Sequence, residues 1–372
     1  MAVFDVIIVG AGPAGSTLAR LLGGQRSVLL LEARNILDAP PSGTSREKCC
    51  GGLLAPDAQA MLRRLDLQLS NAALDSRQPL AVRALDLATG QSRLYPREYV
   101  NMDRPAFERW LLSLLPEGAA VRENARVVSV LWSDASSGWH VRVREPYGVR
   151  EERSRLLVAA DGAGSIVRRL LGSPPRPECR YLAVQDVFES NGSDNRGVSG
   201  RDEYLAFFHP TITDFYGWVI PKRDRTLLGV LLPSRSRRND PIPLLMTSIR
   251  ERLAWYGHVF SGPAKRQGGC ALRPKPEDVF LGVNGAFCVG EAAGFISPSS
   301  AEGFSYAFSS AEALAASILG GFSGRNILAD YAARTRRLRL NMLAKNWKAR
   351  VMYSPPLRRL VMRSGIFADR RG

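Results

Sequence analysis

The fold is decided by residues 3–15, which read VFDVIIVGAGPAG. Residues 3–9 form a nearly continuous apolar run rich in β-branched side chains, which is typical of a buried parallel strand. A glycine turn follows, and from Pro13 to about Leu22 the apolar residues recur with helical spacing. A second apolar strand is predicted at residues 27–31. The sequence therefore predicts a complete strand–helix–strand unit at this end of the chain.

The turn in this unit has the spacing G-x-G-x-x-G. Gly10 allows a tight turn, Gly12 lets the backbone approach a pyrophosphate, and Gly15 permits close packing of the helix. The free N–H groups and partial positive charge of the helix N-terminus attract phosphates. Glu32, at the end of the second strand, can accept hydrogen bonds from both hydroxyls of a ribose. The residues expected to contact a dinucleotide here are Gly10, Gly12, Pro13, Ala14, Gly15, Glu32 and Ala33.

Length and composition favour a large mixed α/β protein. The chain has 372 residues, of which 45% are hydrophobic, and it contains 34 glycines and 23 prolines. Segments at 181–189, 203–209, 215–221 and 226–232 are rich in strand-forming residues and indicate an antiparallel sheet. We expect an α/β fold, with a Rossmann-like dinucleotide-binding domain that includes a β-meander, an inserted antiparallel-sheet substrate domain and a C-terminal helical tail.

The order of these segments predicts how the chain is divided. The predicted parts are a discontinuous dinucleotide-binding domain at 1–80, 99–176 and 270–330, a substrate-binding sheet at 81–98 and 177–269, and a basic helical tail at 331–372. Residues 35–56 are rich in Pro, Gly, Ser and charge and are predicted to form a loop, where functional residues often lie.

The charge balance indicates anionic partners. The chain has 51 Lys and Arg against 35 Asp and Glu, which gives a formal net charge of +16. Such a surface attracts anionic lipid headgroups, a pyrophosphate-bearing substrate, NADPH or an acidic electron-transfer protein. Nucleic acid is not expected as a partner, because the sequence has no basic helix with base-reading residues and no aromatic RNA-binding signature.

Cysteine usage and hydropathy indicate a reducing compartment. None of the five cysteines forms a C-x-x-C pair, so neither a disulfide framework nor a metal site is expected. The first apolar run lacks a preceding basic segment, which favours a strand over a signal peptide. No stretch reaches the ~18 to 20 apolar residues that span a bilayer. We expect a cytoplasmic protein, either free or associated with a membrane surface.

Two later segments resemble motifs of the p-hydroxybenzoate-hydroxylase-like flavoprotein superfamily. Residues 158–162, VAADG, with Arg168 further on, resemble its Asp-Gly motif, which lies beside the FAD pyrophosphate. Residues 286–294, AFCVGEAAG, resemble its second FAD motif, in which an acidic residue binds the ribityl chain. Glu291 stands where the family usually has Asp, which keeps the carboxylate but requires a slightly shifted backbone.

The resemblance implies further contacts with FAD. A helix that follows Gly303 and runs to about Leu319 should point its N-terminus at the N1 and O2 side of the flavin, where its dipole stabilises the anionic reduced state. Arg104, which opens a helix after Asp103, matches an arginine that contacts FAD in the superfamily. The further residues expected at FAD are Arg104, Asp161, Gly162, Gly290, Glu291, Gly303 and Phe304.

Two more segments resemble the geranylgeranyl reductase family within that superfamily. Residues 46–53, REKCCGGL, resemble its K-x-C-G-x-G segment, and residues 215–222, FYGWVIPK, resemble its Y-x-W-x-F-P motif with Ile220 in place of Phe. In that family both segments line the cavity over the isoalloxazine ring, and the resemblance spans most of residues 3–320. The residues that it implies are Cys50, Gly51, Tyr216 and Trp218 at the reacting atoms, and Lys48, Gly52 and Pro221 in the substrate cavity.

The reaction implied by this resemblance is reduction of a carbon–carbon double bond. NAD(P)H or another donor reduces FAD, and the reduced flavin delivers hydride to a double bond of an isoprenoid or another hydrophobic substrate. The proton for the other carbon comes from Tyr216, from Cys50 or from water held by residues 50–52. Cys50 as an inert packing residue and Trp218 as a core residue are equal alternatives. No second G-x-G-x-x-G unit follows a strand, so the reductant has no visible domain of its own.

Two other functions fit parts of the sequence. A flavin-dependent monooxygenase (hydroxylase) or halogenase would act on a small aromatic or lipid-like substrate. Residues 217–221 fit the later part of the halogenase W-x-W-x-I-P segment and Lys48 resembles its catalytic lysine, but Tyr216 replaces the first Trp. A non-catalytic flavin-binding or membrane-associated protein is the second alternative, because the tail from Arg334 to Arg371 has the pattern of a membrane-surface helix. Solvated helices packed on the body explain that pattern equally well.

Overall fold

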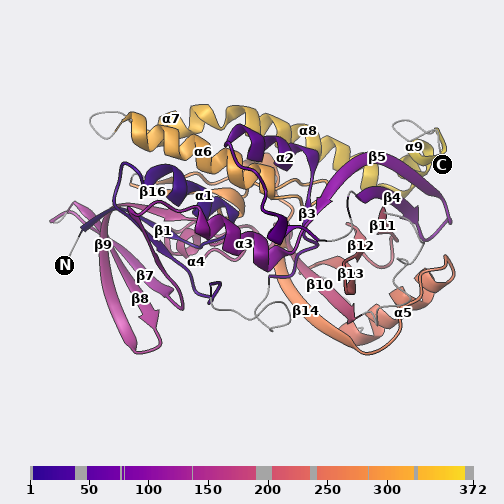
Figure 1. The fold of residues 1–372 in the computed structure, drawn as a ribbon. Helices are drawn as coiled ribbons and strands as arrows, with labels where there is room; N and C mark the ends of the chain where they lie inside the picture. Colours follow the sequence, from indigo (N-terminus) through magenta and orange to yellow (C-terminus); the bar gives the residue numbers. More distant parts are fainter. Residues whose placement is uncertain are drawn as a thin grey trace.

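Two β-sheets form the framework of the molecule and occupy opposite ends of it (Figure 1). The computed structural model describes residues 3–37, 48–75, 78, 80–135, 137–189, 203–234, 241–283, 285–321 and 326–364. Within these residues each sheet has eight strands. The predicted α/β fold is confirmed, because a parallel sheet with covering helices stands beside a mainly antiparallel sheet.

The first sheet has the predicted strand–helix–strand unit at its centre. β1 (Val3–Val9) pairs in parallel with β2 (Val28–Leu31) on one side and with β9 (Gly148–Ala159) on the other. α1 (Pro13–Leu22) connects β1 to β2. The middle of β1 is fully buried, as the apolar run predicts for a strand with neighbours on both sides and helices on its faces.

The other strands of this sheet extend it in two directions. They are β6 (Ala119–Arg122), β7 (Arg126–Ser133), β8 (Gly138–Glu145), β15 (Gly282–Val283) and β16 (Ala286–Cys288). β6 pairs with β2, and β16 pairs with β9, so the parallel part has the order β16-β9-β1-β2-β6. β7, β8 and the first half of β9 form the predicted antiparallel meander.

Helices cover the first sheet and surround the ends of its strands. They are α1, α2 (Pro56–Arg64), α3 (Arg104–Ser113), α4 (Ile166–Leu170), α6 (Phe304–Gly320) and α7 (Ile327–Arg334), with short 3₁₀ turns at Asn71–Ala73, Pro177–Cys179, Pro276–Asp278 and Gly290–Ala293. α1 packs against α6, with Leu18 and Leu314 in one continuous core. α3 begins where the Asp103 carboxylate accepts a hydrogen bond from the N–H of Ala106 at 2.8 Å, which caps the helix.

The second sheet is antiparallel except at one pair. Its strands, in order, are β14 (Ala264–Leu272), β10 (Arg180–Glu189), β13 (Arg225–Pro233), β12 (Gly217–Pro221), β11 (Glu203–Phe208), β4 (Leu80–Asp86), β5 (Ser92–Asn101) and β3 (Leu53–Leu54). Only β11 and β4 run parallel to each other in the described part of this sheet. The segments predicted as strands between 181 and 232 all lie here, and the domain boundaries given above remain a prediction.

One helix of the second half was not predicted. α5 (Ile242–Ala254) covers one face of the sheet, and its buried Met246, Ile249 and Leu253 pack against β13. Their spacing is helical, but the segment lies among strand-rich stretches and is short.

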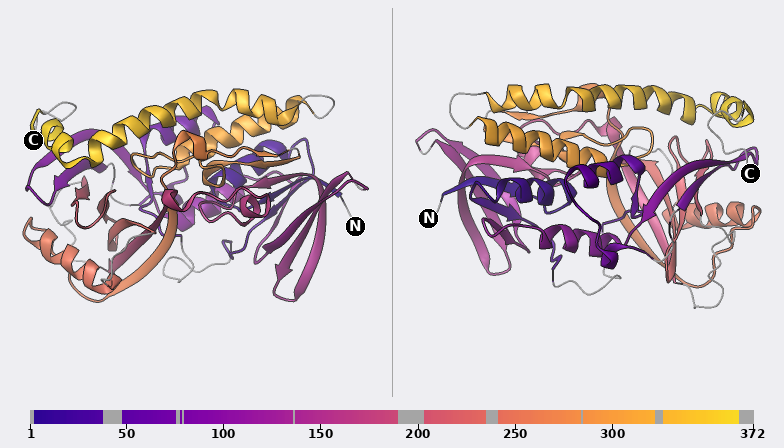
Figure 2. Two further views of the ribbon diagram at one scale, coloured as in Figure 1. Left: turned by 180° about the vertical axis from the view of Figure 1, so that it is seen from behind. Right: turned by 45° about the horizontal axis from the view of Figure 1, so that its top comes forward.

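The C-terminal helices join the two halves. α8 (Arg336–Tyr353) and α9 (Pro355–Ser364) continue from α7 along one edge of the molecule, from the parallel sheet to the antiparallel one (Figures 1 and 2). The Tyr353 hydroxyl donates to the Ser299 carbonyl at 2.7 Å, and the buried Arg358 guanidinium pairs with Asp86 of β4 at 2.8 Å. The tail is therefore a docked helical pair, and residues 365–372 lie outside the described part of the chain.

Candidate functional site

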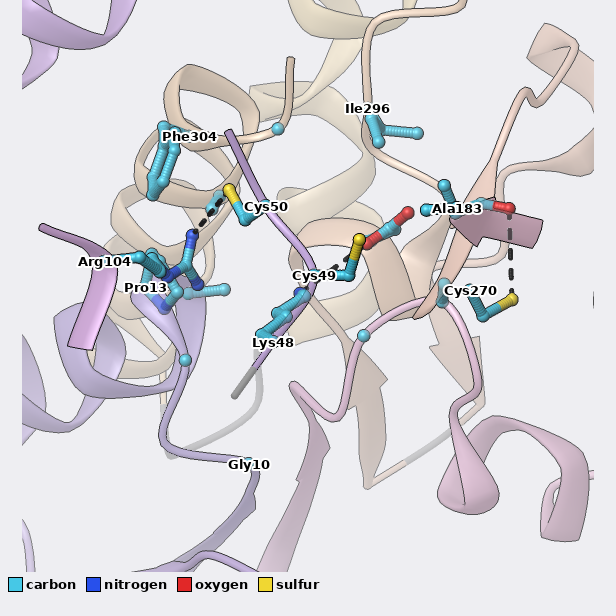
Figure 3. A pocket seen from close by; sticks show the side chains of 18 of the residues that line it. Gly10, Pro13, Lys48, Cys49, Cys50, Arg104, Ala183, Cys270, Ile296 and Phe304 are labelled. Atoms are coloured by element: carbon cyan, nitrogen blue, oxygen red, sulfur yellow. Dashed lines mark hydrogen bonds and ion pairs between the residues drawn. The ribbon is translucent and has the colours of Figure 1, made fainter. Parts of the chain in front are cut away.

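A cavity of about 600 Å³ lies where the two sheets meet. Its walls come from the turn after β1, the ends of β2 and β9, the N-terminus of α6, and strands β10, β11, β12 and β14 (Figure 3). Most of the predicted site residues line it, namely Gly10, Gly12, Pro13, Ala14, Glu32, Ala33, Lys48, Cys50, Gly51, Gly52, Arg104, Asp161, Gly162, Tyr216, Trp218, Glu291, Gly303 and Phe304. A cavity of this size accommodates a large cofactor or ligand.

The glycines of the first turn are required by the backbone around them. Gly10 has a φ of +105°, and a Cβ there would lie 2.6 Å from the Ala160 carbonyl oxygen. A Cβ at Gly15 would lie 1.8 Å from the carbonyl oxygen of Gly10, so α1 could not pack this closely on β1. A Cβ at Gly12 would meet nothing within 4 Å, which leaves the N-terminus of α1 open toward the cavity. Gly15 lies behind the cavity wall, where its role is packing.

Four charged side chains in a row form one wall of the cavity. The Glu32 carboxylate accepts hydrogen bonds from the N–H of Ala11 at 2.9 Å and from Nε of Arg34 at 3.0 Å. Arg34 also donates to Glu108 at 2.9 Å, and Glu108 accepts from Arg104 at 2.6 Å. Although burial opposes its ionisation, the two guanidinium groups lower the pKa of Glu108 to about 2. Glu32 and Arg104 are thus held rigidly.

Nothing in the sequence indicated that Arg34 and Glu108, the two middle residues of this row, lie at the cavity. Arg34 and Glu108 lie 74 positions apart in the chain, and no motif in the sequence links them. Only the approach of α3 to the end of β2 brings them together.

Asp161 supplies an unfilled hydrogen-bond acceptor. Its Oδ2 accepts from the N–H groups of Ile166 at 2.7 Å and Val167 at 3.3 Å. Its Oδ1 is buried and accepts from none of the residues that the structure describes. Burial raises the pKa of Asp161, because a low-polarity surrounding disfavours the carboxylate. Since Asp161 borders the cavity beside the glycine turn, a ligand hydroxyl fits the free oxygen.

The Glu291 carboxylate forms part of the cavity wall. Its Oε1 accepts from the N–H of Leu272 at 3.0 Å, and its Oε2 lies 3.9 Å from Nζ of Lys48. Burial raises the pKa of Glu291, and the Lys48 charge opposes that change. The preceding Gly290 lies outside the cavity, with a φ of +56° and its Cα against α1 and α6.

The N-terminus of α6 borders the cavity. No side chain caps this end of the helix, and Gly303, at the cap position, and Phe304 both line the cavity. The Arg104 guanidinium lies 4.8 Å from the centre of the Phe304 ring. The first N–H groups of α6 and the guanidinium together make this part of the wall electropositive.

The loop at residues 50–52 lies beside Arg104 in the cavity wall. The Cys50 Sγ lies 3.8 Å from an Arg104 nitrogen and accepts from the N–H of Gly52 at 3.4 Å. A Cβ at Gly51 would lie 2.4 Å from Cδ1 of Ile220, so any larger residue there would require that methyl group of β12 to move. Arg46 and Glu47, the first two residues of the motif, lie outside the described residues.

A buried lysine anchors that loop. Lys222, only 3% exposed, donates to the carbonyl oxygens of Gly52 at 3.3 Å and Met102 at 2.9 Å, and to Asn101 Oδ1 at 2.5 Å. Burial lowers its pKa to about 8. The sequence motif ends at Lys222, but nothing in the pattern showed that its side chain turns back to hold the 50–52 loop.

Pro221 corrects one prediction about the cavity wall. It does not line the cavity, and its carbonyl accepts from the Asn101 amide at 2.9 Å. Alternate residues of a strand face opposite sides of the sheet, so when Trp218 and Ile220 face the cavity, Pro221 faces away from it.

Tyr216, just before β12, and Trp218 within it form an aromatic part of the cavity wall. The Tyr216 hydroxyl donates to the Ser300 carbonyl at 2.6 Å, and Trp218 Nε1 donates to Gln185 Oε1 at 3.0 Å. Trp218 is both buried and part of the cavity wall. A Cβ at Gly229 of the neighbouring β13 would lie 2.2 Å from the Trp218 ring, so a side chain at position 229 would collide with the indole.

A line of polar groups runs from the cavity toward the surface. Tyr204 lines the cavity, and its ring lies edge-on to that of Tyr99 with centroids 5.1 Å apart; the Tyr99 hydroxyl donates to Glu302 at 2.7 Å. Glu302 pairs with Arg97 at 3.1 Å, and Arg97 pairs with the half-exposed Asp57 at the same distance. Burial raises the pKa of both tyrosines, so each keeps its proton. No sequence signal could identify this line, because its members come from separate elements.

Comparison with known proteins decides the family. A model described as an FAD binding domain matches residues 3–254. The chain belongs to the p-hydroxybenzoate-hydroxylase-like family of FAD-dependent oxidoreductases. Protein CbrA of Escherichia coli O157:H7 is 36% identical over 365 residues, which are 98% of this chain and 97% of the relative.

Two solved structures share the fold. A geranylgeranyl bacteriochlorophyll reductase-like protein from Thermoplasma acidophilum superposes with a TM-score of 0.78 at 18% identity, over 97% of this chain and 91% of that chain. Aklavinone-11 hydroxylase, in a ternary complex with FAD and aklavinone, gives a TM-score of 0.67 at 21% identity, over 94% of this chain and 70% of that chain. At these identities the similarity concerns the fold.

The cavity suits FAD in this family. The open backbone at Gly12 and the free N–H groups of α1 suit a pyrophosphate, Glu32 suits a ribose, and the free Asp161 oxygen suits a cofactor hydroxyl. The uncapped N-terminus of α6 suits the electron-rich edge of a reduced flavin ring.

The open position of Gly12 yields a cofactor prediction. In Gly12→Glu the new side chain has room in the apo protein but places a carboxylate where the pyrophosphate binds, so we expect a folded protein that purifies with less than a tenth of the wild-type flavin. Gly24→Glu is the matched control, because a Cβ at Gly24 also meets nothing within 4 Å and Gly24 lies outside the cavity. Absorbance near 450 nm measures flavin, and circular dichroism measures folding. Equal flavin in both variants would contradict the assignment.

Lys222 yields a prediction about pH. Its pKa falls from 10.5 to about 8 on folding, so between these values the unfolded chain binds more protons than the folded one. The free energy of unfolding should therefore rise with pH from 8 upward, by up to about 3 kcal/mol from this group. We expect Lys222→Met to lose this rise and the exposed Lys265→Met to keep it, as measured by urea unfolding at several pH values. The same slope in all three proteins would exclude Lys222 as its source.

Proposed function

We propose that this chain is an FAD-dependent reductase that transfers hydride to a carbon–carbon double bond of an isoprenoid or another hydrophobic substrate. The observation that carries the proposal is the meeting of two segments distant in sequence. The 50–52 loop packs on Ile220 of β12, and Tyr216 and Trp218 at the start of that strand line the same cavity, beside the N-terminus of α6. Both segments resemble the motifs that line the substrate cavity of geranylgeranyl reductases.

The lining of this part of the cavity supports a hydrophobic substrate. Ile220, Leu231, Ile296 and Ala271 lie among its residues, and few side chains there carry charge. An apolar chain gains about 25 cal/mol for each Å² of surface that such a wall removes from water. The aromatic rings of Tyr216 and Trp218, with centroids 5.9 Å apart and planes inclined at 55°, add further apolar surface.

Bound FAD would supply the hydride and accept electrons from a donor. The residues proposed to hold it are Gly10, Gly12, Pro13, Ala14, Glu32, Ala33, Arg104, Asp161, Gly162, Glu291, Gly303 and Phe304. We propose NAD(P)H as the donor class, supported by the net charge of +16, which attracts its phosphates.

Tyr204 is the group that we propose as proton donor to the second carbon. It lines the apolar part of the cavity, whereas the Tyr216 hydroxyl is engaged with the Ser300 carbonyl and the Cys50 thiol faces Arg104. The proton leaves the Tyr204 oxygen for the carbon, and the phenolate regains one from Tyr99. Tyr99 in turn regains a proton through the Glu302 carboxylate, which is 18% exposed and takes that proton from water.

The monooxygenase or halogenase alternative is supported by the similarity to aklavinone-11 hydroxylase and by residues 217–221. Two observations favour the reductase. Tyr216 occupies the position of the first Trp of the halogenase segment. Lys48, the residue that resembles a catalytic lysine, lies 3.9 Å from Glu291 beside the predicted ribityl position.

Mass spectrometry of host lipids tests the reaction. Cells that express the intact protein or Gly24→Glu should contain polyprenyl species that have gained pairs of hydrogen atoms, and cells that express Gly12→Glu should lack them. Species that have instead gained oxygen or halogen would contradict the reductase and support the alternative.

Removal of the Tyr204 hydroxyl tests the proton step. In Tyr204→Phe we expect turnover to fall by about 10² to 10⁴, the usual range for loss of a general acid. Flavin content and anaerobic reduction of the flavin by dithionite should be unchanged. Tyr181→Phe is the control, because Tyr181 is a tyrosine of the same sheet that loses its hydroxyl in the same way, hydrogen-bonds to Asp214 and lies outside the cavity.

Glu302→Gln extends this test along the line of polar groups. It should slow turnover less than Tyr204→Phe does and should increase the solvent deuterium isotope effect, because proton delivery becomes slower. If Tyr204→Phe turns over as fast as the wild type, Tyr204 is not the proton donor. That result would not contradict the proposed hydride transfer.

A further inference from the structure

We infer that the outer face of α8 and α9 is a docking surface for an anionic phospholipid bilayer. The inference concerns binding alone and does not depend on the proposed reaction. Among the described residues no helix is long and apolar enough to cross a membrane, so the contact is with the bilayer surface.

The outer side of these helices exposes large apolar side chains. We call this surface the outer helical face, and its apolar members are Leu340, Leu343, Trp347, Val351, Leu357 and Leu360, between 38% and 66% exposed. In α8, Arg336 and Arg350 share one stripe with the first four, because their spacings of three and four place all six within a sector of roughly 100°.

The opposite side of α8 is already occupied by the body of the protein. Met342 and Ala349 are buried, Lys345 pairs with Asp57 at 3.2 Å, and the Asn346 amide donates to the Pro274 carbonyl. The outer apolar side chains therefore have no place in the protein core. Their exposure is a cost that contact with another apolar phase removes.

The charge of the segment identifies the occupant. Residues 336–364 contain nine Arg and Lys and no Asp or Glu. Basic residues near an anionic membrane surface are attracted to it, and acidic residues are repelled. Arginine beside exposed leucine and tryptophan suits the headgroup region, where the guanidinium meets lipid phosphate and the apolar side chains enter the layer below.

The outer helical face is connected to the cavity. Tyr353, at the end of α8, donates to the Ser299 carbonyl at 2.7 Å, and the next carbonyl, that of Ser300, accepts from Tyr216. Docking would thus hold the loop at 299–300 beside the lipid phase. If the proposed function is correct, a hydrophobic substrate would come from the bilayer. Only this origin of the substrate rests on the proposed function.

Vesicle flotation of the flavin-loaded protein tests the inference. At 0.1 M NaCl we expect the protein to float with vesicles of 30% phosphatidylglycerol in phosphatidylcholine and not with pure phosphatidylcholine. Raising NaCl to 0.5 M should weaken binding, because salt screens the exposed charges. The double variant Arg336→Glu/Arg350→Glu should bind the anionic vesicles at least tenfold more weakly.

A matched variant separates the outer helical face from the overall charge. Arg142→Glu/Arg144→Glu makes the same change in net charge on exposed residues of β8, at the far end of the molecule, and should bind as the wild type does. Equal weakening in both double variants would overturn the inference, since binding would then follow net charge alone. No flotation of the wild type at 0.1 M NaCl would also overturn it and would favour an acidic protein as the occupant.

Depth of insertion gives an independent readout. Vesicles with brominated acyl chains should quench tryptophan fluorescence of the wild type and of Trp255→Phe, but much less that of Trp347→Phe. Trp255 is a suitable control, because it is 89% exposed and lies at the end of α5. Equal quenching in Trp347→Phe and the wild type would contradict insertion of this face.

Discussion

The close approach of the β1–α1 turn to β9 is the constraint on which the rest of the structure depends. A Cβ at Gly10 would overlap the Ala160 carbonyl, and a Cβ at Gly15 would overlap Gly10 itself. Because these positions carry no side chain, the carboxyl ends of β1 and β9 and the N-terminus of α1 converge at one point. Asp161 follows β9 there, and Glu291 follows its neighbour β16. The cofactor residues are therefore brought together by strand order.

The second half of the cavity depends on buried charge. Lys222 links Gly52 of the 50–52 loop to Asn101 and Met102 by donating to one oxygen of each, and the row from Glu32 to Arg104 holds the cofactor side through alternating charges. Burial of such groups is costly unless each is paired, so their presence at the walls is better explained by positioning than by stability. Both sets link elements that are distant in the chain, and together they fix the relative positions of the elements that line the cavity.

The sequence was most informative where one local pattern determines both structure and chemistry. The G-x-G-x-x-G turn, Glu32 and the Asp161-Gly162 motif each combine a backbone requirement with a contact, so the βαβ unit and the FAD family followed from them. The FAD family is confirmed, while the roles of individual residues remain predictions. Pro221 was assigned to the wrong side of β12, because the motif match took no account of the alternation of side chains between the two faces of a strand. Arg34, Glu108, Tyr99 and Tyr204 were missed because only tertiary packing brings them together.

Anaerobic stopped-flow spectroscopy tests the central claim most directly. Protein whose flavin has been photoreduced is mixed, without oxygen, with vesicles that contain a geranylgeranyl lipid, and the flavin absorbance near 450 nm is followed. The account predicts that the flavin is reoxidised and that the lipid gains two hydrogen atoms for each flavin. Flavin that stays reduced until oxygen is admitted, with oxygen then found in the product, would contradict it.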